Sequence, residues 1–156
     1  MTTNGKDAPG VVAIPPLIYL AFLAAGVLLD YIFPVAVLPD RLQYALGFAL
    51  IAAAATAMPF VLRQFFRAGT SFDVRKPASV LVTDGPYRYS RNPAYLALTF
   101  LYAGIGIAAD SLWVLVLLLP ILAVMRYGVI LPEERYLERK FGEDYLRYKR
   151  SVRRWL

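Results

Sequence analysis

A long apolar stretch between two polar blocks most constrains how this chain can fold. Residues 96–131 are mainly apolar, with a short polar turn at residues 108–111. Two helices of this composition are predicted to cross a bilayer, whose hydrocarbon core of about 30 Å takes about 20 helical residues and admits no unpaired backbone. We therefore expect the polar blocks on either side, residues 85–95 and 133–145, to emerge on the same membrane face.

The chain as a whole is unusually apolar for its length. Its 156 residues are 59% hydrophobic, and the mean hydropathy is +0.53. We expect one domain, an all-α integral membrane protein with about four transmembrane helices, a cytosolic loop and a C-terminal amphipathic helix. The expected spans cover about residues 11–33, 42–65, 94–109 and 112–131.

The basic residues indicate how these spans are oriented. The formal net charge is +6, and the basic residues gather around residues 66–93 and 132–156. Short segments rich in lysine and arginine stay in the cytoplasm, so both segments and both termini are predicted to be cytosolic. This topology accounts for the charge without a nucleic-acid partner. Residues 1–10 are small and polar, and we expect a disordered tail there.

The chain has neither cysteine nor histidine. This excludes disulfides, thiolate nucleophiles and cysteine-ligated zinc, and it removes the commonest metal ligand and general base. We therefore expect no metal site, and a catalytic vocabulary of Glu, Asp, Tyr, Arg and Lys. The lack of cysteine and of organelle signals favours a prokaryotic inner membrane.

Transfer of an already activated group suits a site of this kind. Such a reaction depends mainly on positioning, which supplies roughly 7–11 kcal/mol through proximity alone. S-adenosyl-L-methionine has a cationic sulfonium, which favours carboxylates and aromatic faces, and a carboxylate, which favours arginine. The two polar blocks hold these residue types, at Tyr87, Tyr89, Arg91, Tyr95, Glu133 and Glu134.

The two blocks also carry a family resemblance, made by Gly85-Pro86-Tyr87-Arg88-Tyr89-Ser90-Arg91-Asn92-Pro93-Ala94-Tyr95 and by Glu133-Glu134, Leu137, Phe141-Gly142, Tyr145 and Tyr148. They resemble the isoprenylcysteine carboxyl methyltransferase and phospholipid methyltransferase superfamily of integral membrane enzymes, over about residues 70–155. The resemblance implies S-adenosyl-L-methionine as cofactor and a lipophilic acceptor that enters from the bilayer. The cofactor-binding positions that it implies are Tyr87, Arg91, Asn92, Pro93, Tyr95, Glu133 and Glu134.

Asn92 bears on the identity of the methyl acceptor. Prenylcysteine carboxyl methyltransferases usually have histidine at this point, whereas Asn-Pro-x-Tyr is similar to the phospholipid N-methyltransferases of the group. A carboxylate, an amine and a thiol all stay open as acceptors, as does the oligomeric state. Arg126, about one turn inside the fourth span, either snorkels or pairs with a cofactor or substrate carboxylate. With Glu134 it is a candidate catalytic residue.

The tail after the hairpin is predicted to be helical and amphipathic. Pro132 and the two glutamates after it are typical of a helix start, because proline suits the first turn and acids suit the positive end of the helix dipole. Apolar and aromatic residues then recur every three or four positions over residues 134–155. Gly142 leaves open whether this is one helix or two, and a helix lying on anionic lipid fits the same pattern.

Two other functions fit parts of the sequence. NADPH-dependent sterol-type membrane reductases end in a similar Gly-Pro-Tyr and Arg-x-Pro-x-Tyr region, but their chains are much longer. A non-enzymatic membrane scaffold would use the basic tail to bind lipid or a partner protein. A transporter subunit of this kind would carry polar pathway residues in its spans, and few are present.

Overall fold

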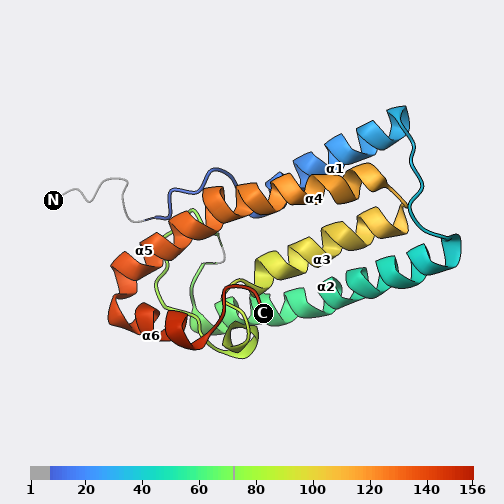
Figure 1. Ribbon diagram of the computed structural model, residues 1–156. Helices are drawn as coiled ribbons and strands as arrows, with labels where there is room; N and C mark the ends of the chain where they lie inside the picture. The colour runs from blue at the N-terminus through green and yellow to red at the C-terminus, as the bar shows by residue number, and fades with distance from the viewer. Residues whose placement is uncertain (1–7, 72) are drawn as a thin grey trace.

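In the described part of the chain, four long helices form a bundle, and the loop between the second and the third of them and the two C-terminal helices gather at one end of it (Figure 1). The computed structural model describes residues 8–71 and 73–156, and in that part of the chain only helices and loops occur. The long helices are α1 (Pro15–Ile32), α2 (Asp40–Ala68), α3 (Pro93–Ala108) and α4 (Leu112–Val124). The loop between α2 and α3 lies at the same end as the helices that follow α4, so the two polar blocks meet there.

The composition and length of these helices suit a membrane. Among the described residues, three helical stretches are long and apolar enough to cross one: Pro15–Ile32, Arg41–Ala68 and Leu112–Phe141. α3 is also apolar, but its 16 residues, at about 1.5 Å each, make it about 24 Å long, short of a hydrocarbon core of about 30 Å. Many large apolar side chains are exposed, as lipid contact requires. The prediction of an all-α integral membrane protein is confirmed.

Small residues allow α2 and α3 to approach closely. A Cβ atom on Gly47 would lie 2.6 Å from the backbone nitrogen of Ala108, and one on Gly104 would lie 2.9 Å from the Gly47 carbonyl oxygen. In lipid, helices associate through such packing, because the hydrocarbon around them is as apolar as their side chains. These contacts lie near the start of α2 and the end of α3, at the end of the bundle away from the polar segments.

A π-helical segment joins α4 to α5. Through η2 (Met125–Ile130) the helix continues unbroken into α5 (Leu131–Phe141), so Pro132 lies inside a helix and the prediction of a helix start there is wrong. Proline lacks the N–H that would bond to the Gly128 carbonyl four residues earlier. The Val12 N–H donates to that carbonyl at 3.0 Å, so the segment before α1 replaces the missing donor.

Gly142 divides the tail into two helices. Its φ of 52° and ψ of −125° are a conformation that residues with a side chain rarely adopt, and the chain turns there between α5 and α6 (Glu143–Ser151). This break places α6 across the polar end of the bundle (Figure 1). Of the tail expected over residues 1–10, residues 1–7 lie outside the described part, whereas Pro9 is buried.

We predict that Gly47→Ala destabilises the bundle. The new Cβ meets the backbone of Ala108, so the helices must separate. Such overpacking costs about 1–3 kcal/mol, only partly offset by the better helix propensity of alanine, about 1 kcal/mol. The midpoint of thermal unfolding in detergent measures this. Gly10→Ala is the control, because a Cβ there meets no described atom within 4 Å, and equal midpoints would contradict the close contact.

Candidate active site

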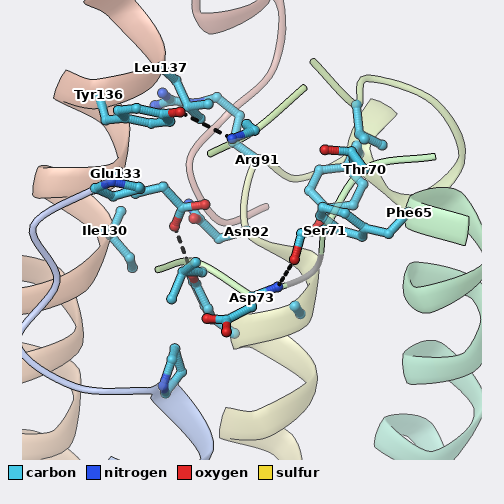
Figure 2. Close-up of a pocket in the computed structure, with 18 of the residues that line it drawn as sticks. Phe65, Thr70, Ser71, Asp73, Arg91, Asn92, Ile130, Glu133, Tyr136 and Leu137 are labelled. Atoms are coloured by element: carbon cyan, nitrogen blue, oxygen red, sulfur yellow. Dashed lines mark hydrogen bonds between the residues drawn. The ribbon is translucent and has the colours of Figure 1, made fainter. Parts of the chain in front are cut away.

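A cavity of about 330 Å³ lies where the two polar blocks meet. Its walls come from the segment before α1, the end of α2, the loop over residues 70–82, the start of α3, and helices α5 and α6. Its volume lies at the lower end of the range for small-molecule sites. In Figure 2 the side chain of Glu133 extends from its helix toward the middle of the cavity, and Ser71 and Asp73 lie on the opposite side.

The two adjacent glutamates have different partners. The Oε2 atom of Glu133 accepts a hydrogen bond of 2.7 Å from the Tyr95 hydroxyl, and no lysine or arginine of the described residues forms an ion pair with it. In Glu134, Oε1 lies 3.0 Å from Arg91 Nη1 and 2.9 Å from Arg154 Nε, and Oε2 accepts from Arg154 Nη2 at 2.9 Å. Glu133 is therefore the carboxylate available to a ligand, and Glu134 holds two arginines.

The guanidinium group of Arg91 lines the cavity, and one of its hydrogen-bond donors has no partner among the described residues. Its side chain is 8% exposed, and its Nε atom is buried without a hydrogen-bond partner among the described residues. A buried donor in this state is unfavourable unless a ligand completes it. Arg91, Arg154 and Glu134 together carry a net charge of +1, so this corner of the cavity suits an anion.

The loop before α3 owes its shape to a glycine and to contacts with α6. Gly85 has a φ of 61°, a conformation that residues with a side chain rarely adopt. The 3-10 helix η1 (Gly85–Arg88) follows, and the Tyr148 hydroxyl donates to the Tyr87 carbonyl at 2.7 Å. These contacts hold the Tyr87 side chain, which is 9% exposed, in the cavity wall.

Two further side chains that line the cavity, Tyr145 and Asn92, are neutral near pH 7. Burial raises the pKa of Tyr145 to about 12, so its hydroxyl, which Arg91 Nη1 approaches at 3.4 Å, does not add a negative charge. Asn92 Nδ2 donates to the Arg154 carbonyl at 2.9 Å. The amide of Asn92 is therefore held by the protein.

Most of the predicted site residues line the cavity, namely Tyr87, Arg91, Asn92, Tyr95, Glu133 and Glu134. Pro93 does not line it; it is buried at the first position of α3, where the fixed φ of proline suits a helix start. Tyr89 is 77% exposed.

Arg126 lies outside the cavity. It is exposed, with its guanidinium 5.7 Å from the centre of the Tyr127 ring. In a regular α-helix, residues 126 and 133 would share a face, because they are seven positions apart. The π-helical turns of η2 hold more residues per turn, and so rotate Arg126 away from Glu133. The predicted contact of Arg126 with a cofactor or substrate in this cavity does not occur in this arrangement.

The sequence analysis did not identify two charged side chains at or beside the cavity, Arg154 and Asp73. Arg154 follows α6 in a run of basic residues, and only the need of buried Glu134 for a cationic partner singles it out. Asp73 lines the cavity, where the hydrogen bonds from Arg75 lower its pKa to about 2. It is the only acid between residues 66 and 83, a composition signal that was available in the sequence.

The fold defines an all-α integral membrane protein with a cavity at one end of a helical bundle. The chain belongs to the phospholipid methyltransferase family, whose model matches residues 42–144. This match runs from α2 into α6 and leaves α1 and Arg154 outside.

Similarity to individual proteins is short. The chain is 71% identical over 24 residues to an uncharacterized protein of Haemophilus influenzae, a match that covers 15% of this chain and 38% of that relative. The chain thus matches well under half the length of that relative. No solved structure matches.

We predict that the two glutamates contribute differently to stability. Glu134→Gln leaves the buried Arg91 and its partner Arg154 without a counter-charge, and breaking a buried pair in this way costs about 3–5 kcal/mol. Glu133→Gln keeps an oxygen that accepts from Tyr95, so we expect a change below about 1 kcal/mol. Thermal unfolding of the ligand-free variants in detergent separates them. Equal midpoints, or a less stable Glu133→Gln, would contradict the assignment.

Proposed function

We propose that this protein transfers a methyl group from S-adenosyl-L-methionine to a lipophilic acceptor at the cytosolic face of a prokaryotic inner membrane. Membership of a methyltransferase family supports the reaction class. The observation that carries the proposal is that one cavity holds both a cation and a carboxyl group: Arg91, whose Nε is unpartnered among the described residues, and Glu133, without a basic partner among them.

The residues of the cavity fit the charges of this cofactor. The amino-acid part of S-adenosyl-L-methionine has a carboxylate, which suits the net positive group formed by Arg91, Arg154 and Glu134. Its ammonium and sulfonium are cationic, and both suit the Glu133 carboxylate. The adenosine part suits the aromatic and apolar wall that includes Tyr136 and Leu137.

Catalysis in this proposal depends on positioning. The cofactor supplies a methyl group already activated on a sulfonium. Tyr95 fixes the orientation of Glu133 by its 2.7 Å hydrogen bond, and Glu134 fixes Arg91 at 3.0 Å. With a ligand held at both of these points, the protein sets the direction from which an acceptor approaches, and proximity of this kind lowers a barrier by roughly 7–11 kcal/mol.

The side of the cavity nearest the bundle suits a lipophilic acceptor. Its lining there is apolar, with Ile14, Met58, Leu98 and Ile130. The surrounding polar end has the basic residues expected on the cytosolic face, where lipid head groups and a water-soluble cofactor meet. The acceptor is therefore proposed to be a lipid-type molecule that offers a carboxylate, an amine or a thiol.

We predict that calorimetric titration of detergent-purified protein detects S-adenosylmethionine and S-adenosylhomocysteine but not NADPH. Arg91→Lys and Glu133→Gln should each weaken binding of S-adenosylhomocysteine by about 10- to 100-fold, or about 1.4–2.8 kcal/mol. Arg88→Lys is the matched control, because Arg88 is exposed in the same block and does not line this cavity.

The titration also separates the competing functions. Binding of NADPH alone would favour a reductase, and binding of none of the three would favour a scaffold; either result would overturn the proposal. A loss of affinity in Arg88→Lys equal to that in Arg91→Lys would contradict the assignment of the anion site to Arg91.

A further inference from the structure

The residues after α6 return to the start of α3. We call residues 152–155 the strap; in Figure 1 the chain runs from α6 back toward the bundle there. The Arg91 N–H donates to the Arg153 carbonyl at 2.9 Å. The Arg154 carbonyl accepts from Asn92 Nδ2 at 2.9 Å and from the Ser90 hydroxyl at 3.3 Å. Two strap carbonyls thus hold three consecutive residues, two of which line the cavity.

The side chain of Arg154 adds a second connection to the same site. Its Nε and Nη2 atoms donate to the two oxygens of Glu134, both at 2.9 Å. A two-point contact of this geometry fixes the plane of the carboxylate, which a lysine cannot do. The fixed Oε1 atom of Glu134 then lies 3.0 Å from Arg91 Nη1.

Arg91 and Arg154 share the carboxylate of Glu134. The positive charge of Arg91 is therefore only partly neutralised by it. If Arg154 were absent, both oxygens of Glu134 would be available to Arg91, and that pair would be electrically neutral. With Arg154 present, Glu134 contacts Arg91 through one oxygen, and Arg91 Nε stays without a partner among the described residues. The group then has an excess positive charge on the cavity side.

We infer that Arg154 is a positioning residue of the cofactor site, which acts through Glu134 to orient Arg91 toward the carboxylate of the bound cofactor. This inference rests on the proposed function. It assigns to the strap, which lies beyond the residues matched by the family model, a part in recognising the amino-acid moiety of the cofactor and none in recognising its adenosine.

The test compares two ligands in each variant of the full chain. S-adenosylhomocysteine has the amino-acid carboxylate, whereas 5′-methylthioadenosine keeps the adenosine and a thioether but lacks the whole amino-acid part. We expect Arg154→Ala to weaken binding of S-adenosylhomocysteine at least 10-fold and to leave binding of 5′-methylthioadenosine within 2-fold. A purely structural role would weaken both ligands in parallel or neither.

Two further variants complete the design. Arg153→Ala is the matched control: its side chain is exposed, and only its carbonyl bonds to Arg91, so both affinities should match the unsubstituted protein. Arg154→Lys keeps the charge without the two-point contact and should show an intermediate loss, for S-adenosylhomocysteine only. If Arg154→Ala cannot be purified folded, Arg154→Lys provides the same comparison.

The outcomes distinguish this inference from the proposed function. If the unsubstituted protein binds neither adenosyl ligand, the proposed function and the inference both fail. If it binds S-adenosylhomocysteine, and the ratio of the two affinities is unchanged in Arg154→Ala and Arg154→Lys, the inference alone is overturned.

Discussion

The polar end of this protein depends on one buried carboxylate. Glu134, whose side chain is 7% exposed, contacts Arg91 and Arg154 together and so connects α5, the start of α3 and the segment after α6. Burying the charges of Glu134 and Arg91 is unfavourable unless each is well paired, because desolvation offsets much of the attraction. The two-point contact with Arg154 meets that condition for Glu134. It leaves one positive charge in excess, directed at the cavity through Arg91.

The two neighbouring glutamates point in different directions and have different partners. Successive residues of a helix lie about 100° apart, so one carboxylate is directed toward the arginines while the other enters the cavity. Among the described residues, Glu133 is paired with the Tyr95 hydroxyl and with no basic side chain, and so stays available to a ligand. In a chain without histidine or cysteine, this separation of the two carboxylates supports the proposed binding of a ligand that carries both an anionic and a cationic group.

Sequence patterns predicted much of the fold and of the candidate site, and the rest depends on local geometry. Hydropathy and the two polar blocks predicted an all-α membrane protein, and six of the seven expected cofactor-binding residues line the cavity. The helix start expected at Pro132 was wrong, because Val12, far away in the sequence, donates to the Gly128 carbonyl that proline leaves without a donor. Arg126 was misplaced because η2 changes the helical phase. Arg154 was missed because no periodicity shows which of several tail arginines pairs with Glu134.

The most direct test of the central claim is an experimental structure of the protein with S-adenosylhomocysteine bound. The account predicts that the carboxylate of the ligand forms a hydrogen bond with Arg91 Nε, that Glu133 lies on the opposite, cationic side of the amino-acid moiety, and that Glu134 keeps both arginines. A ligand carboxylate bound away from Arg91, or a Glu134 that leaves Arg154 to contact the ligand, would contradict it.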